Sequence, residues 1–64
     1  MTADNLQLAQ IRTTLTARRR ELRLTQRELA IRIARSATWV SEMEQGKAEP
    51  SADGLESWAR ALGM

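Results

Sequence analysis

The sequence predicts an all-α fold of four short helices, and three observations support this prediction. Apolar residues recur at intervals of three and four along most of the chain, which is the spacing of one helix face. Residue types that cap helix starts precede these runs, and glycine follows two of them. No segment shows the apolar and polar alternation of a strand. With 64 residues the chain is expected to form one domain, residues 1–64, around one modest core.

The first two helices are predicted from their apolar faces. Residues 4–22 carry a first apolar stripe at helical spacing: Leu8, Ile11, Leu15 and Leu22. The second helix begins at Thr25, because Thr25 and Glu28 form a T-x-x-E capping box in which each side chain accepts from the other residue's backbone N–H. Its apolar face follows directly: Leu29, Ala30 and Ile33.

The third and fourth helices have clear start and stop signals. Ser36 is a suitable N-cap for the third, and Gly46, which tolerates a left-handed backbone, ends it. The inward side of this third helix is predicted to carry Ala37, Val40, Met43 and Glu44. Pro50 then prevents helix continuation, and Ser51 caps the fourth helix. The stripe of this last helix is Leu55, Trp58, Ala59 and Leu62, with Trp58 expected in the core.

A tight turn of about three residues, Ala34 to Ser36, separates the second and third helices. Two short helices joined in this way, at about residues 25–45, form the helix-turn-helix arrangement. In this arrangement the second helix of the pair can enter the major groove of DNA, although such hairpins also occur as plain packing units.

The composition argues against an enzyme. The chain has no cysteine and no histidine, which excludes disulfides, thiolate nucleophiles, the usual zinc ligands and the commonest general base. We therefore expect no catalytic site, no metal and no cofactor. The apolar runs are far shorter than the roughly 20 residues of a membrane span, and the N-terminus lacks the features of a signal peptide. A cytoplasmic protein without membrane contact is expected.

The charges are distributed unevenly along the chain. Nine of the ten basic residues are arginine, and they concentrate between Arg12 and Arg35, whereas acidic residues dominate from Glu42 to Glu56. This asymmetry predicts one basic surface that faces a polyanion such as nucleic acid. Solvated helix faces without a partner are the alternative.

Three motifs then define a family resemblance. They are L-T-Q-x-E-L-A from Leu24, S-x-x-x-V-S-x-x-E-x-G-K from Ser36, and P-S at Pro50 followed by A-x-A-L-G at Ala59. Together they resemble the phage repressor and Cro (Xre-like) family of helix-turn-helix regulators. The resemblance implies a lambda-repressor-like DNA-binding domain. Members commonly continue into a fifth helix after the position of Gly63. The resemblance therefore leaves open whether the chain is a four-helix domain or a piece of a five-helix one.

The resemblance also implies a function and a partner. It implies a cytoplasmic, nucleoid-associated transcriptional regulator of prokaryotic or phage type, more specifically a repressor. Such a protein acts as a homodimer on double-stranded DNA with an inverted-repeat operator. Phage or plasmid regulators, restriction-modification controllers and antitoxins all fit this description.

Site residues follow by matching positions. The resemblance implies base contacts from the third helix, at Ser36, Ala37, Thr38, Ser41 and Glu42. It implies phosphate contacts at Gln26 and Lys47, and the basic rim adds Arg27 and Arg35 as expected phosphate contacts. Arg19 and Glu44 match a structural ion pair between the first and third helices. A helical-wheel projection independently places Thr38, Glu42 and Gln45 opposite Val40 and Met43.

The sequence departs from the family pattern at several positions. Ala34 and Arg23 stand where members commonly have glycine, so a positive φ there would cost roughly 1–2 kcal/mol of strain. The third helix has no basic residue, and Trp39 replaces a small polar one. Trp39 is expected to wedge against DNA, to stack in a protein contact or to pack over the turn. An acidic third helix also suits a protein-interaction module on the same scaffold, which is the alternative function.

Overall fold

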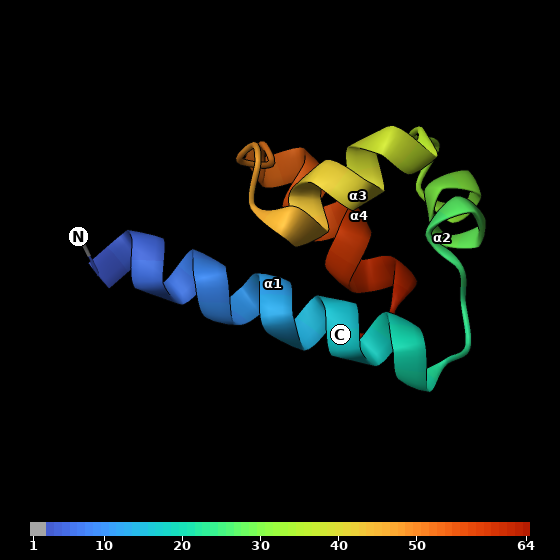
Figure 1. The fold of residues 1–64 in the computed structure, drawn as a ribbon, viewed down its shortest axis with the longest axis horizontal. Helices are drawn as coiled ribbons and strands as arrows, with labels where there is room; N and C mark the ends of the chain where they lie inside the picture. The colour runs from blue at the N-terminus through green and yellow to red at the C-terminus, as the bar shows by residue number, and fades with distance from the viewer. Residues whose placement is uncertain (1–2) are drawn as a thin grey trace.

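Four helices in close succession account for most of the chain in the computed structural model, which describes residues 3–64. They are α1 (Ala3–Glu21), α2 (Gln26–Arg32), α3 (Ala37–Gln45) and α4 (Ala52–Ala61). Figure 1 shows α1 as a long rod whose first turns extend past the other three helices. No strand occurs in this part of the chain, so the predicted all-α fold class is confirmed.

The predicted helix starts are present as side-chain caps. The Thr25 hydroxyl accepts from the Glu28 backbone N–H at 3.0 Å, and the Thr25 backbone N–H donates to the Glu28 carboxylate at 2.9 Å. Ser36 accepts from the Trp39 backbone N–H at 3.0 Å, and Ser51 accepts from that of Gly54 at 3.1 Å. Helices α2, α3 and α4 therefore begin where short-range sequence signals place them.

The four helix ends share one hydrogen-bond pattern. In each, a residue with positive φ reverses the chain, and the following backbone N–H donates to a carbonyl five residues earlier, as in a Schellman motif. The left-handed residues are Arg23 (φ 58°), Ala34 (φ 56°), Gly46 (φ 78°) and Gly63 (φ 76°). Two of the four are not glycine, so the strain expected at Arg23 and Ala34 is present in the fold.

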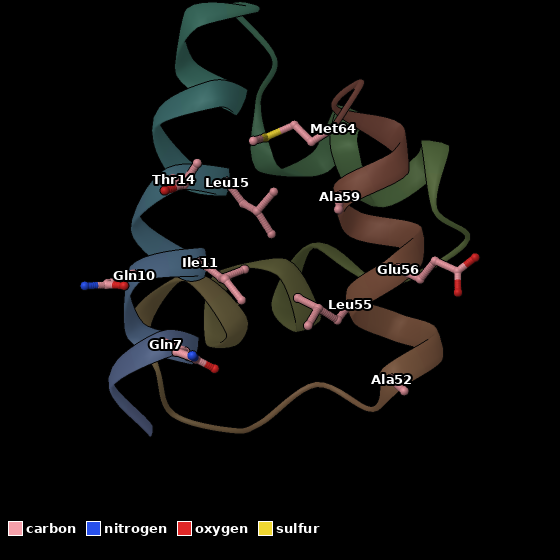
Figure 2. Close-up of a pocket in the computed structure, with 10 residues that line it drawn as sticks. All are labelled: Gln7, Gln10, Ile11, Thr14, Leu15, Ala52, Leu55, Glu56, Ala59 and Met64. Carbon is pink, nitrogen blue, oxygen red and sulfur yellow. The ribbon is translucent and has the colours of Figure 1, made fainter. Parts of the chain in front are cut away.

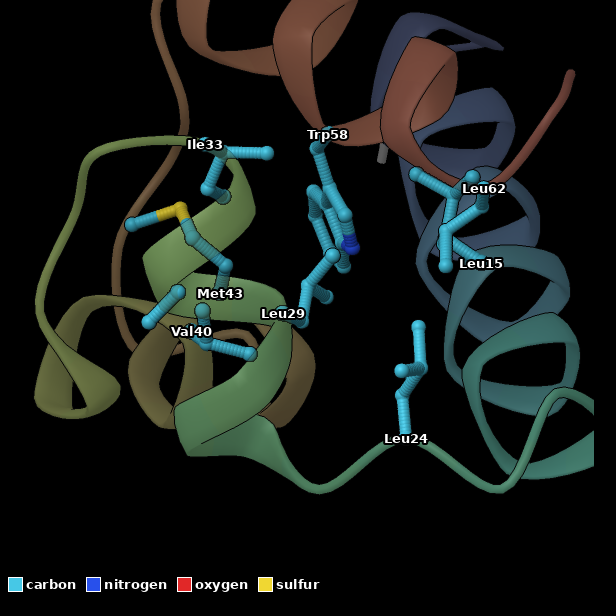
Figure 3. Packing of buried hydrophobic residues seen from close by; sticks show 9 residues of the cluster. Leu15, Leu24, Leu29, Ile33, Val40, Met43, Trp58 and Leu62 are labelled. Atoms are coloured by element: carbon cyan, nitrogen blue, oxygen red, sulfur yellow. The ribbon is translucent and has the colours of Figure 1, made fainter.

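One apolar cluster joins all four helices (Figure 3). Trp58 of α4 is completely buried and points into the cluster between α1 and the α2–α3 pair, as predicted for a core residue. The other largest fully buried side chains are Leu15, Leu29, Val40 and Leu62. The predicted α1 stripe is only partly buried: Ile11 is 38% exposed and Leu22 is 40% exposed. Leu22 lies one residue beyond the end of α1.

An apolar cleft of about 710 Å³ lies between α1 and α4. Figure 2 shows Ile11 and Leu15 of α1 pointing toward Leu55 of α4, while Gln10 and Glu56 point away. No residue of α2 or α3 lines this cleft. A molecule bound in the cleft would therefore leave the surface of the α2–α3 pair exposed. Among residues 3–64, no helix combines the length and hydropathy needed to cross a membrane.

Candidate nucleic-acid interface

Helix α3 presents a polar outer face because its apolar residues are held in the core. Val40 is completely buried and Met43 is 3% exposed. On the other side Thr38, Glu42 and Gln45 are exposed, and we call these three residues the outer face of α3. Of the remaining predicted base contacts, Ser36 and Ala37 at the start of α3 are exposed and Ser41 is half-buried. The prediction that Ala37 belongs to the inward side of this helix is therefore wrong. The Gln45 amide donates to the Ser41 hydroxyl, one helical turn earlier, at 2.7 Å.

A buried ion pair fixes α3 against α1. The Arg19 guanidinium donates to the two Glu44 carboxylate oxygens, from Nε at 2.6 Å and from Nη2 at 3.0 Å. The two side chains are 10% and 5% exposed. Arg19 also donates from Nη1 to the Leu24 carbonyl at 2.7 Å, so the same side chain holds the α1–α2 turn. The pair that the family resemblance implied is therefore present, and Glu42 is left as the charged residue of the outer face.

Gln26 joins this network at the start of α2. Its side-chain amide donates to Glu44 Oε1 at 3.0 Å, and the residue is half-buried. A side-chain amide has two donor hydrogens, so this contact occupies one and leaves the second for a phosphate oxygen. The Glu44 carboxylate thus orients both Arg19 and Gln26. The other predicted phosphate contacts, Arg27, Arg35 and Lys47, are all exposed.

Arg35 and Trp39 form a stacked pair at the start of α3. The guanidinium carbon of Arg35 lies 5.0 Å from the centroid of the Trp39 ring. The Trp39 ring meets Trp58 edge to face, with centroids 6.1 Å apart and planes at 75°. Of the arrangements expected for Trp39, the isolated chain thus adopts packing over the turn. Gly54 permits it, because a Cβ at this position would lie 3.1 Å from Trp39 Cζ2.

Several arginines of α1 bind the protein itself. Arg12 Nη2 donates to the Ala48 carbonyl at 3.0 Å, and Arg18 Nε donates to the Leu62 carbonyl at 3.2 Å. With Arg19 they connect α1 to the α3–α4 loop, to the end of α4 and to α3. The expectation of one basic surface from Arg12 to Arg35 is therefore wrong for Arg19, which is buried, whereas Arg12 and Arg18 remain partly exposed. Helix and loop ends leave carbonyls open, and a guanidinium with five donors can reach them.

Two of these contacts were not predicted from the sequence: the approach of Gly54 to Trp39 and the hydrogen bond from Arg12 to the Ala48 carbonyl. Gly54 stands in the first turn of a predicted helix, and an isolated helical glycine is the signal that would have indicated a close approach. Arg12 offered no comparable signal, because its acceptor is a backbone carbonyl 36 residues away. In the part of the chain that the structure describes, no cluster of three acidic side chains is placed to hold a metal ion.

A short helix pair with a tight turn, whose second helix is supported from behind and exposed in front, defines a helix-turn-helix protein. Residues 10–64 match the family model described as a helix-turn-helix domain, and the chain belongs to that family. Membership indicates DNA binding, and with it transcription regulation, as the class of function. The chain matched no curated protein and no solved structure.

Proposed function

We propose that this protein is a sequence-specific regulator of the phage repressor and Cro (Xre-like) type that acts as a repressor on double-stranded DNA. The proposal treats residues 1–64 as one domain that pairs with a second copy on an inverted repeat. A two-fold dimer places its two α3 helices in successive major-groove segments roughly 34–36 Å apart. Binding there would exclude polymerase from an overlapping promoter.

The observation that carries the proposal is the two-sided character of α3. Its inner side is fixed by Val40, Met43 and the Arg19–Glu44 pair, while its outer face is polar and exposed. A rigid polar helix face of this kind suits contact with base edges. Thr38 offers a methyl group for a thymine methyl and a hydroxyl for a base, and Glu42 can accept from a cytosine amino group.

Phosphate contacts would supply affinity and register. The proposed contacts surround α3: Gln26, Arg27, Arg35 and Lys47. Gln26 is oriented by Glu44, whereas the three cations are exposed. Base contacts are proposed for Ser36, Ala37, Thr38, Ser41 and Glu42, with Ser36 and Ala37 at the helix start that enters the groove first.

Selection from a random library of DNA duplexes at two salt concentrations tests the proposal. We expect one enriched motif with two-fold symmetry, and a steep fall in affinity as salt increases. The matched pair of variants is Thr38→Ala on the outer face and Ser57→Ala on α4, both of which remove an exposed hydroxyl. Thr38→Ala should change the motif at one position in each half, and Ser57→Ala should leave it unchanged.

A protein-interaction module is the second candidate, and the charge of α3 favours it. The helix has no basic residue, and its outer face carries the exposed carboxylate of Glu42, which repels phosphate. If no duplex is enriched even at low salt, the DNA-binding proposal is rejected and this candidate replaces it. Sedimentation at several protein concentrations tests the homodimer separately.

A further inference from the structure

We propose that Trp39 is a positioning residue, which holds the Arg35 guanidinium ready for a DNA phosphate beside the start of α3. This inference rests on the proposed function. It adds a role for a residue that itself need not contact a base.

The backbone of Arg35 is fixed by the end of α2. Its N–H donates to the Ala30 carbonyl at 2.9 Å, and the preceding residue, Ala34, has the left-handed conformation that reverses the chain. The following residue, Ser36, caps α3 through the Trp39 backbone N–H. The backbone of Arg35 therefore has a defined position between α2 and α3.

The side chain of Arg35 is held by an aromatic surface that is itself immobilised. The guanidinium lies 5.0 Å from the Trp39 centroid, and the Trp39 ring rests with an edge contact against the fully buried Trp58. The ring also lies close to α4 at Gly54, where a Cβ would lie only 3.1 Å from Cζ2 and 3.5 Å from Arg35 Nη2. Stacking on a fixed ring restricts the arginine before any ligand arrives.

The hydrogen-bonding groups of Arg35 remain available. Arg12, Arg18 and Arg19 all donate to protein acceptors. Among the side chains of residues 7–64 and the described backbone, the Arg35 guanidinium has no hydrogen-bond or ion-pair partner, and the residue is exposed. Stacking uses the face of the guanidinium and leaves its N–H groups at the edge, where they can bind two phosphate oxygens.

The position of Arg35 relative to α3 indicates a phosphate as its ligand. Arg35 lies one residue before the N-cap, and Lys47 lies one residue after Gly46 at the opposite end. Exposed cations that flank a helix seated in the major groove lie within reach of the phosphates that border the groove. A side chain that is already ordered loses less entropy on making this contact.

The test measures binding to a labelled duplex of about 20 base pairs, the motif enriched by selection, across a range of salt concentrations. Arg35→Gln should reduce the slope of log K against log salt by about 0.9, the value for one lost phosphate contact. Trp39→Leu should weaken binding about two- to fivefold, the range that exposed cation–π contacts support. In the Arg35→Gln background, Trp39→Leu should have no further effect.

Three further variants separate positioning from a general structural role. Trp39→Phe retains an aromatic face and should restore most of the affinity lost in Trp39→Leu. Arg35→Lys, which leaves the core unchanged, should keep the salt slope but lose affinity, because an ammonium lacks the flat stacking surface. Arg20→Gln removes an exposed charge from α1 and should leave both readouts unchanged. Circular dichroism at the assay temperature establishes that each variant is folded.

The outcomes distinguish the two proposals. Absence of any duplex binding by the unaltered protein rejects the proposed function, and the role of Trp39 with it. Duplex binding together with an unchanged salt slope in Arg35→Gln, or with additive losses in the double variant, rejects only the positioning role. If Trp39→Leu does not fold, equal affinities of the Arg35→Lys variant and the unaltered protein would also reject it.

Discussion

The Arg19 guanidinium and the Glu44 carboxylate, 25 residues apart in the chain, meet through two hydrogen bonds that are 2.6 and 3.0 Å long. Both side chains are nine-tenths buried or more. Since Glu44 also accepts from Gln26, one carboxylate connects α1, α2 and α3. The orientation of the outer face of α3 therefore depends on a charged contact inside the protein as well as on apolar packing.

Removal of one member of this pair is expected to be strongly destabilising. Glu44→Ala leaves the Arg19 charge poorly solvated and unpaired, which should lower the free energy of unfolding by about 3–5 kcal/mol. A domain of this size has only about 3–10 kcal/mol in total, so the loss should be a large fraction of the stability of the parent protein. Urea denaturation followed by circular dichroism measures the loss.

The matched control is Glu21→Ala, which removes the carboxylate paired with Arg18 on the exposed side of α1. An exposed pair contributes about 0–1 kcal/mol, so this variant should remain close to the parent protein. Equal effects of Glu21→Ala and Glu44→Ala would contradict the central role of the buried pair.

Ala34→Gly is expected to stabilise the protein. Ala34 has φ 56° and is exposed, so glycine removes left-handed strain without loss of packing. After allowance for the greater chain entropy of unfolded glycine, the gain should be about 0.5–1 kcal/mol. Ala17→Gly, at an exposed position within α1, should instead cost about 1 kcal/mol. Thermal unfolding of both variants tests this, and a lower melting temperature for Ala34→Gly would contradict it.

Gly54→Ala should fail to give the usual benefit of alanine in a helix. That benefit is about 1 kcal/mol, but here the new Cβ would lie 3.1 Å from Trp39 Cζ2 and 3.3 Å from Ser51 Oγ. We expect Gly54→Ala to be neutral or destabilising in the parent protein. In a Trp39→Leu background the same change should become stabilising, and a double-mutant cycle of unfolding energies measures this coupling.

The capping box makes one contribution to stability dependent on pH. The Thr25 backbone N–H, and after it the Thr25 hydroxyl, hold the pKa of Glu28 below its ordinary value. Because the pKa is lower in the folded state, this contribution is complete above the unfolded pKa and is lost as pH falls through the folded pKa. The stability advantage of the parent over Glu28→Gln should be present at neutral pH and should shrink on acidification. An advantage that grew at low pH would contradict this assignment.

Base and phosphate contacts should differ in their effect on specificity. Thr38→Ala is expected to relax preference at one base pair by about 1–3 kcal/mol, because it removes a direct base contact. Lys47→Ala should weaken binding to all duplexes alike and reduce the salt slope by about 1. Competition between the enriched duplex and single-base variants measures both effects. The roles assigned to Thr38 and Lys47 would be wrong if Lys47→Ala altered the preferred base.

Local signals predicted the fold well, because helix starts depend on residues close in sequence. Thr25, Ser36 and Ser51 each cap a helix where the pattern placed it. The α1 stripe was predicted less well, since the burial of Leu22 depends on where the helix ends and on what packs against it. Ile11 satisfies helical spacing, yet it borders the α1–α4 cleft and remains partly exposed.

The candidate site also has one part that the sequence predicted and one part that it did not. The exposure of Thr38 and Glu42 followed from helical geometry, because Val40 and Met43 fix the opposite side. The inward contacts of Arg12 and Arg18 could not be predicted, because their acceptors are backbone carbonyls 36 and 44 residues away. A count of charges along the chain does not show whether a guanidinium faces solvent or the protein.

The edge contact between Trp39 and Trp58 also determines how the molecule can be observed. These are the only two aromatic residues, since the chain has no tyrosine and no phenylalanine. Near-ultraviolet absorption and intrinsic fluorescence therefore originate from one ring on α3 and one on α4. Light emitted by the unlabelled protein therefore reports the docking of these two helices without any added probe.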